Sequence, residues 1–260
     1  MNNSKVFLKN KAIMDKIIEA AELDKNDIVL EIGSGDGRLT EKIASKAKKV
    51  YAVEKDLFLI DKSKVKLSNY KNIEFMNQDI LEISFPEDVN KIISNLPYSI
   101  ASPITERIIR FMNNHTNSIA VLMYQKEFGE RMLAAPGYTD YSMLTVFCTY
   151  TCSINKIMDV SKANFRPIPS VDSIVIKIKP KNIKIDDNFI NFCKLIFQHK
   201  KKNVYTAIMS SRSKLKTSDK DLIREKLSKV NKNYLKEKVF FLSLDDLMDL
   251  YKEVVSAGIW

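Results

Sequence analysis

The sequence predicts an α/β fold in which a mostly parallel sheet of seven strands is followed by a small all-helical domain. Three observations lead to this prediction. Short β-rich runs alternate with helical patterns over the first part of the chain, a glycine-rich loop follows the first apolar run, and no proline occurs after Pro180. A chain of 260 residues can hold two domains, and we place them at residues 1–180 and 181–260.

Each element is predicted from the spacing of its apolar residues. Five short runs have the length and composition of buried parallel strands, and the stretches between them show helical spacing. The expected strands cover 28–32, 50–54, 73–76, 91–94 and 118–123. The expected helices cover 11–22, 38–46, 57–67, 102–112 and 125–134.

The end of the predicted sheet has a different pattern. Residues 144–151 and 173–179 are both β-rich, and no clear helix separates them. We therefore expect these two runs to form an antiparallel pair that completes the sheet. From residue 181 onward the sequence is helical in character, with no glycine before Gly258.

The chain is basic, with a formal net charge of +10. Residues 181–260 hold 17 Lys and Arg against 10 Asp and Glu, so they carry most of the excess. This distribution favours a polyanionic partner such as nucleic acid. The run His199-Lys200-Lys201-Lys202 is a candidate for binding backbone phosphates, although a solvated helix face would have the same composition.

Cysteine usage and hydropathy exclude several classes of protein. The three cysteines form no C-x-x-C pair and no histidine cluster accompanies them, so we expect reduced thiols and no metal site. No apolar run approaches the length of about 18 residues that a membrane span needs, and the N-terminus lacks the apolar core of a signal peptide. We therefore expect a cytoplasmic protein without a membrane partner.

A glycine-rich loop, Glu31-Ile32-Gly33-Ser34-Gly35-Asp36-Gly37, follows the first strand and precedes a helix. Glycines at this place let the backbone turn tightly and approach a ligand. The spacing is G-x-G-x-G and departs from the dinucleotide fingerprint, which favours an adenosyl ligand without a pyrophosphate. A strand-to-helix turn without a ligand is the alternative interpretation.

Two acidic residues follow the next strands. Glu54 ends the second strand, where a carboxylate can accept hydrogen bonds from both hydroxyls of a ribose. Asp79 follows the third strand and can accept the amino group of an adenine, with Ile80 packing on the ring. Because ligands gather at the carboxyl ends of parallel strands, we expect both side chains to line one site.

The fourth strand ends in Asn95-Leu96-Pro97-Tyr98, which indicates methylation of an exocyclic adenine amine. That nitrogen is a poor nucleophile, because its lone pair is delocalised into the ring. The carboxamide oxygen of Asn95 can accept one N–H and the Leu96 carbonyl the other, which draws the lone pair out of the ring plane. Pro97 fixes the backbone, and Tyr98 can stack on the purine. The catalysis expected is mainly positioning and local electrostatics.

With these motifs, the chain resembles the family of ribosomal RNA small-subunit adenine N6,N6-dimethyltransferases, and more distantly the erythromycin-resistance methyltransferases of the large subunit. The resemblance extends from Phe7-Leu8 to Phe165-Arg166-Pro167-Ile168-Pro169-Ser170-Val171-Asp172-Ser173. Residues 124–132, 136–142 and 196–200 are similar to the archaeal and eukaryotic branch.

The resemblance implies a Rossmann-like, class I S-adenosylmethionine-dependent methyltransferase that dimethylates adjacent adenosines in a hairpin near the 3′ end of small-subunit (16S) rRNA during ribosome biogenesis. It implies that 181–260 helps to bind RNA. We also expect the enzyme to act as a monomer. Phe165 is expected to offer a second aromatic face to the flipped target base. The implied cofactor contacts are Leu8, Gly33, Gly35, Glu54, Asp79, Ile80 and Asn95.

The N-terminal motif departs from the family. The usual pattern is G-Q-x-F-L, whereas here Ser4, Lys5 and Val6 precede Phe7-Leu8. We therefore expect the N-terminal contacts to cofactor or RNA to be weaker or to be made differently.

Other functions are compatible with parts of the pattern. The same chemistry could act on large-subunit rRNA or on DNA, although DNA adenine methyltransferases more often carry a second proline where Leu96 stands. A non-catalytic RNA-binding factor of ribosome assembly could retain the fold, but the intact Asn95–Tyr98 segment argues against it. The glycine spacing counts against a nicotinamide-dependent dehydrogenase.

Overall fold

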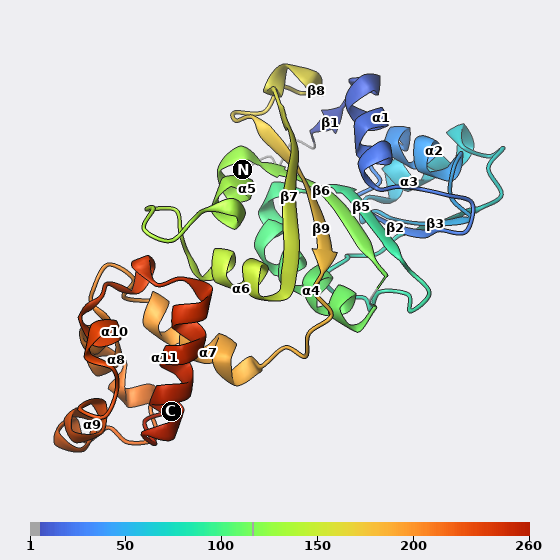
Figure 1. Cartoon of the computed structure of the whole chain (residues 1–260). Coiled ribbons are helices and arrows are strands. Elements are labelled where there is room, and N and C mark those ends of the chain that lie inside the picture. Colours follow the sequence, from blue (N-terminus) through green and yellow to red (C-terminus); the bar gives the residue numbers. More distant parts are fainter. Residues whose placement is uncertain (1–5, 116) are drawn as a thin grey trace. The chain divides into compact units, whose positions relative to one another are not determined.

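The computed structural model describes residues 6–115 and 117–260, and contacts divide the chain into two compact units. The first comprises 1–129 and 151–183, and the second 130–150 and 184–260. Figure 1 shows a sheet with flanking helices in the first unit and a group of helices in the second. Residues 130–150 thus group with the C-terminal part, while the division into functional domains at residue 180 stays a prediction.

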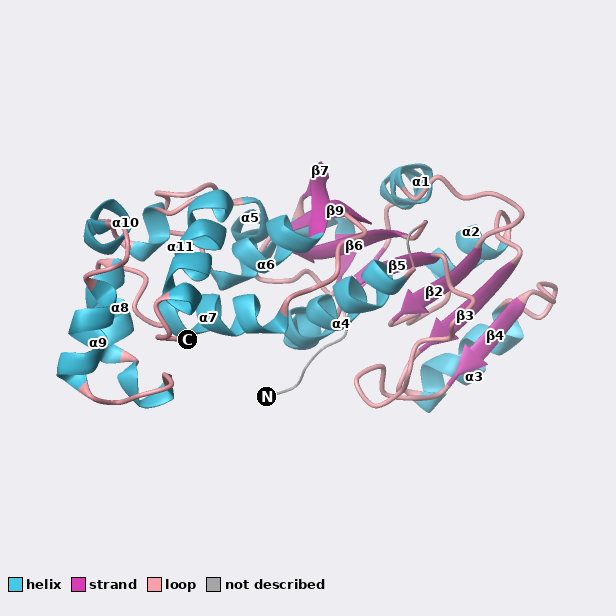
Figure 2. Cartoon of the chain, turned by 60° about the horizontal axis from the view of Figure 1, so that its bottom comes forward, coloured by secondary structure: helices cyan, strands magenta, loops and turns pink. Residues whose placement is uncertain are grey.

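The first unit is built on the predicted seven-stranded, mostly parallel sheet, which is confirmed. The strand order is β4-β3-β2-β5-β6-β9-β7, and all neighbours from β4 to β6 are parallel (Figure 2). β9 is antiparallel to both β6 and β7. The strands are β2 (Ile28–Ile32), β3 (Lys49–Val53), β4 (Ile73–Met76), β5 (Lys91–Asn95), β6 (Ile119–Gln125), β7 (Cys152–Val160) and β9 (Ser173–Pro180).

Helices cover both faces of this sheet, as a buried parallel sheet requires. Met14 and Ile17 of one helix and Ile43 of another pack into one core with alternate strand residues such as Val121. On the opposite face, Thr105 shares a hydrogen bond of 2.9 Å with the Tyr124 hydroxyl. The helices are α1 (Lys11–Ala20), α2 (Arg38–Ala44), α3 (Leu57–Lys66), α4 (Ala101–Asn114) and α5 (Lys126–Leu133).

One predicted strand is wrong. Residues 144–151 lie in helix α6 (Met143–Thr151), and the partner of β9 is β7. The run is rich in β-branched and aromatic residues, whose preference is weak enough for packing to override it. Within the helix the Thr149 hydroxyl donates to the Thr145 carbonyl at 2.8 Å, one turn earlier. This bond is one way in which a helix accommodates threonine.

A small second sheet joins the N-terminal segment to the loop that precedes β9. β1 (Phe7–Leu8) pairs antiparallel with β8 (Phe165–Arg166), so Leu8 lies opposite Phe165. The short 3-10 helix η2 (Lys162–Asn164) directly precedes β8, and a second one, η1 (Tyr98–Ile100), lies between β5 and α4. The two motifs most distant in sequence are thereby held together by main-chain hydrogen bonds.

The part of the second unit after residue 184 is helical, as predicted. Capping side chains such as Asp186, Asn203 and Ser243 fix the helix starts. The helices are α7 (Asp187–Phe197), α8 (Val204–Ser210), η3 (Arg212–Lys214), α9 (Lys220–Leu227), α10 (Lys232–Lys236), η4 (Val239–Phe241) and α11 (Leu244–Ser256).

Cys148, Cys152 and Cys193 are buried free thiols. Among residues 6–115 and 117–260, every helix is too short or too polar to cross a bilayer.

Candidate active site

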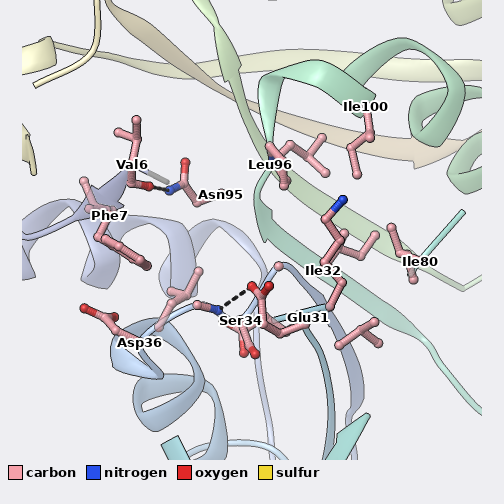
Figure 3. Close-up of a pocket in the computed structure, with 18 of the residues that line it drawn as sticks. Val6, Phe7, Glu31, Ile32, Ser34, Asp36, Ile80, Asn95, Leu96 and Ile100 are labelled. Carbon is pink, nitrogen blue, oxygen red and sulfur yellow. Dashed lines mark hydrogen bonds between the residues drawn. The ribbon is translucent and has the colours of Figure 1, made fainter. Parts of the chain in front are cut away.

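A pocket of about 290 Å³ lies at the carboxyl ends of the parallel strands (Figure 3). It is centred where the strand order reverses, because the chain proceeds outward from β2 to β3 and β4 on one side and from β5 to β6 on the other. Such a switch point is where open α/β sheets bind ligands. All predicted site residues except one line this pocket, namely Leu8, Gly33, Gly35, Glu54, Asp79, Ile80, Asn95, Leu96, Pro97 and Tyr98.

The glycine-rich loop is tied to the neighbouring strand. The amides of Gly33 and Ser34 both donate to the carbonyl of Val53, at 2.9 and 3.1 Å. Gly35 has a φ of +55°, and a Cβ on it would lie 3.0 Å from Cε1 of Phe7. The loop therefore needs glycine both for its left-handed backbone and for the close approach of the N-terminal segment.

Glu54 is fixed by backbone amides on both carboxylate oxygens. Gly35 N donates to Oε2 at 3.2 Å and Asp56 N donates to Oε1 at 3.0 Å. The residue is buried, so its orientation is well defined. Each carboxylate oxygen can accept more than one hydrogen bond, which allows this side chain to receive two hydroxyls of a ribose in addition.

The segment after β4 is held by an arginine that was not among the residues predicted from the sequence. Arg107 of α4 donates to the carbonyl of Ile80 at 2.6 Å and also to the carbonyl of Ile83. Asp79 accepts a hydrogen bond of 2.9 Å from the Leu81 amide, which shapes the turn. Arg107 lies 27 residues from Ile80, and no motif near it indicates this contact.

The segment that was predicted to hold the target base continues directly from β5. The Leu96 amide donates to the Met123 carbonyl at 3.2 Å, so β6 holds the strand end. The Asn95 amide nitrogen donates to the Val6 carbonyl at 3.3 Å, and Figure 3 shows its oxygen pointing away from Val6. Tyr98 shares a hydrogen bond of 2.9 Å with the hydroxyl of Ser173.

The pocket lining is acidic although the chain is basic. Four acidic side chains line it together with two basic ones, Arg38 and Lys55, which lie 3.0 Å from Asp36 and 4.0 Å from Asp79. One of the four, Glu31, mostly holds a proton near neutral pH, because burial, aided by the nearby carboxylates of Asp36 and Glu54, raises its pKa from an ordinary value of 4.5 to about 8. An acidic pocket of this kind suits a ligand that carries positive charge.

Two buried polar atoms in the pocket wall lack a partner within the described part of the chain. They are Oε2 of Glu31 and the hydroxyl of Ser34. Buried polar groups are normally hydrogen-bonded. Together with the close approach that the glycines allow, these atoms indicate that the wall is shaped to receive a polar ligand.

Phe165 is the one predicted site residue that does not line the pocket. Its side chain is fully buried in the core that also contains Leu8. Its role in stacking on a target base stays a prediction. Val6 does line the pocket, whereas Ser4 and Lys5 lie outside the described residues. No group of three or more potential metal ligands occurs among the residues that the structure describes.

Comparison with known proteins identifies the family. The family described as ribosomal RNA adenine dimethylase matches residues 2–242. The chain belongs to this family. A protein of Methanosarcina mazei named "Probable ribosomal RNA small subunit methyltransferase A" is 39% identical over 245 residues, covering 93% of this chain and 88% of that protein. A Pyrococcus furiosus protein of the same name is 35% identical over 255 residues, covering 97% and 91%.

Solved structures agree with this assignment. The crystal structure of a dimethyladenosine transferase from Plasmodium falciparum matches with a TM-score of 0.84 and 31% identity, covering 97% of this chain and 98% of that one. The crystal structure of the 23S rRNA methyltransferase ErmE matches with a TM-score of 0.69 and 23% identity, covering 96% and 99%, which shows a common fold.

Membership in the adenine dimethylase family confirms several predictions. The chain is an S-adenosylmethionine-dependent methyltransferase with the class I fold. The resemblance to the archaeal branch also agrees with the archaeal sources of these relatives. The individual site residues stay predictions, and the pocket geometry is the basis on which their roles are proposed below.

Proposed function

We propose that this protein dimethylates N6 of adjacent adenosines in a hairpin near the 3′ end of small-subunit rRNA during ribosome biogenesis. The observation that carries the proposal is the position of Asn95. Its side chain stands at the end of β5, in the same pocket as Glu54 and the glycine-rich loop, with its amide nitrogen already bonded to Val6. The names of the relatives, which specify the small-subunit RNA, support the choice of substrate.

In this proposal the chain holds the methyl donor in the acidic part of the pocket. S-adenosylmethionine supplies, when bound, a methyl group on a positively charged sulfur. Glu54 would accept hydrogen bonds from the ribose, and Asp79 from the adenine amine, with Ile80 packed on the ring. Gly33 and Gly35 would allow close approach of the loop, and Leu8 would pack near the methionine end.

The target adenine would lie against the Asn95–Tyr98 segment. The Asn95 oxygen and the Leu96 carbonyl would accept the two N6 hydrogens, which directs the lone pair out of the ring plane. Pro97 offers no competing donor, and Tyr98 would stack on the purine face. After the first transfer N6 still has one hydrogen to donate, so the same acceptors can serve the second transfer.

The basic C-terminal part, 181–260, would bind RNA. Its net charge of +7, from 17 basic and 10 acidic residues, supports this role. We propose that the enzyme acts as a monomer. We propose the cytoplasm, where ribosomal subunits are available, as the place of action.

The substrate is tested by transfer of labelled methyl groups from S-adenosylmethionine. Purified protein would be incubated separately with under-methylated small subunits, with large-subunit RNA and with DNA. The proposal predicts label in the small-subunit RNA alone. Label only in large-subunit RNA or in DNA would contradict the choice of substrate while leaving the methyltransferase chemistry intact.

A further inference from the structure

A hydrogen bond joins the Asn95–Tyr98 segment to Ser173, the last residue of the Phe165–Ser173 motif. The hydroxyls of Tyr98 and Ser173 are 2.9 Å apart, although 75 residues separate them in sequence. Tyr98 is half-buried and lines the pocket, whereas Ser173 is completely buried and lies outside it. One end of this bond is therefore at the site of the reaction and the other is in the protein interior.

Ser173 is held rigidly by the sheet. As the first residue of β9 it pairs with Gln125 of β6 on one side and with Val160 of β7 on the other. The preceding residue, Asp172, is also fixed by two hydrogen bonds of 2.9 Å. The Lys126 amide donates to its main-chain carbonyl, and the Lys162 amide donates to its carboxylate. A hydroxyl on such a frame has a defined position.

Tyr98 lacks this kind of support in the main chain. It begins the short helix η1 directly after Pro97, and the end of β5 lies only three residues earlier. An aromatic side chain at a pocket wall can change rotamer unless packing or a hydrogen bond prevents it. The bond to Ser173 attaches the far end of the ring to the sheet, so that the ring plane is set before a base arrives.

We infer that Ser173 is a positioning residue for methyl transfer and that it acts through Tyr98. It fixes the ring in the orientation in which it stacks on the target adenine, a role that rests on the function proposed above. Preorganised groups of this kind matter because a misplaced base loses its alignment with the methyl carbon. The same bond connects the serine that ends the F-x-P-x-P-x-V-D-S motif to the pocket, although Ser173 itself does not line it.

The test is a double-mutant cycle with Ser173→Ala, Tyr98→Phe and the combination. Tyr98→Phe keeps the ring and removes only the hydroxyl, so each single variant deletes the same bond from one side. We expect each to lower the single-turnover methylation rate by about 2–10-fold, the effect of one ordinary hydrogen bond. The double variant should be no slower than the slower single variant. The Kd for S-adenosylmethionine should not change.

Two further measurements separate positioning from a general effect on the fold. Ser118→Ala is the matched control, because Ser118, like Ser173, is a buried serine with a hydrogen-bonded hydroxyl. The Ser118 hydroxyl donates to the main-chain carbonyl of His115 at 2.7 Å, and the residue does not line the pocket. This control should methylate at the wild-type rate. RNA with 2-aminopurine at the target position should show weaker fluorescence quenching with Ser173→Ala and Tyr98→Phe than with wild type, since stacking on Tyr98 causes the quenching.

Two results would overturn the inference. One is a double variant whose rate loss is the product of the losses in the two single variants, and the other is a wild-type rate and wild-type quenching in both single variants. Such a result would leave the proposed function standing as long as the wild-type protein methylates adenosine. If the wild-type protein transfers no methyl group to adenosine, the proposed function itself fails. Tyr98→Phe keeps a half-buried ring and is expected to fold even if Ser173→Ala does not. In that case a wild-type rate and wild-type quenching in Tyr98→Phe would by themselves overturn the inference, because this variant already lacks the bond to Ser173.

Discussion

The side-chain amide of Asn95 donates a hydrogen bond to the main-chain carbonyl of Val6, 3.3 Å away. A carbonyl can only accept, so this contact fixes which end of the carboxamide is nitrogen and leaves the oxygen to receive an amine hydrogen. Because the acceptor is main chain, the contact does not depend on the side chain at position 6. This explains how the chain can keep the Asn95 side chain in this orientation although its N-terminal motif departs from the family pattern at Val6.

Replacing Asn95 should abolish methyl transfer. In Asn95→Ala the proposed acceptor for N6 is lost together with the contact to Val6, and loss of one such preorganised group lowers kcat by about 100–1000-fold. Single-turnover methylation of small-subunit RNA measures this. The thermal unfolding temperature should stay close to wild type because the side chain is only half-buried. A rate within a few-fold of wild type would refute the assigned role.

A methyl group on Gly35 should weaken binding of S-adenosylmethionine. Gly35→Ala places a Cβ at a φ of +55° and 3.0 Å from the ring of Phe7. The left-handed backbone alone costs roughly 1–2 kcal/mol, and the displaced Phe7 alters the pocket wall. Calorimetric titration gives the Kd, and denaturant unfolding gives the stability.

Gly258→Ala is the control for this substitution. Gly258 also has a positive φ, +69°, but it lies in the second unit, and its added Cβ would meet only the flexible end of Lys226, at 3.4 Å. It should lose a similar amount of backbone stability while binding S-adenosylmethionine as wild type does. Equal affinities in the two variants would show that Gly35 does not serve the pocket.

Arg107 should act on the cofactor through Ile80. Arg107→Met removes the two hydrogen bonds to the Ile80 and Ile83 carbonyls. Charge-assisted bonds of this kind are worth about 1.5–3 kcal/mol, so the KM for S-adenosylmethionine should rise roughly tenfold or more while kcat changes little. The matched control is Arg110→Met on the same helix, where the arginine instead pairs with Glu106. Equal KM values for the two variants would contradict this role.

Stability should depend on pH through Glu31. Its pKa is raised to about 8 in the folded protein from an ordinary value of 4.5, chiefly by burial. Between these values the folded state holds a proton that the unfolded chain has released, so the free energy of unfolding falls as pH rises. Glu31→Gln has no proton to release here, so this fall in the free energy of unfolding should disappear. The unfolding temperature of the variant should therefore change less than that of wild type between about pH 5 and about pH 8. The exposed carboxylate variant Glu41→Gln should keep the wild-type pH dependence, and an unchanged slope in Glu31→Gln would disprove the assignment.

The lysines of the run at 200–202 should have different roles. Lys200 donates to the carbonyls of Thr139 at 2.7 Å and Tyr141 at 2.9 Å, within the second unit, so Lys200→Ala should lower stability. Lys201 and Lys202 are exposed. Their joint replacement by alanine should weaken RNA binding and lower the slope of log K against log salt by about 1–2. An unchanged slope, measured by filter binding at several salt concentrations, would show a solvated surface without RNA contact.

Local patterns were sufficient to predict most of the fold, and packing decided the remainder. Apolar periodicity and the glycine loop are properties of adjacent residues, so the parallel strands and their carboxyl-end site were predictable. Residues 143–151 have a strand-like composition, and their helix forms because Val146, Phe147 and Cys148 are buried together by tertiary packing. No local pattern contains that information.

The contrast between local sequence patterns and tertiary contacts also applies to the residues of the site. Residues in recognisable motifs, such as Glu54 and Asn95, could be assigned to one pocket before the structure was known. Arg107 and Ser173 could not be assigned, because they contribute through hydrogen bonds to residues far away in the sequence. For Phe165 the motif predicts a ring that faces the target base, whereas its side chain is fully buried in this structure.

Identification of the methylated nucleoside is the decisive experiment for the proposed reaction. Small-subunit RNA lacking the modification would be incubated with S-adenosylmethionine and either wild-type protein or Asn95→Ala, and then digested to nucleosides for mass spectrometry and mapped by primer extension. We expect N6,N6-dimethyladenosine at adjacent positions of a hairpin near the 3′ end with wild type, and none with Asn95→Ala. Methylation of another base or another adenine nitrogen, or an equal yield from Asn95→Ala, would contradict the proposed reaction.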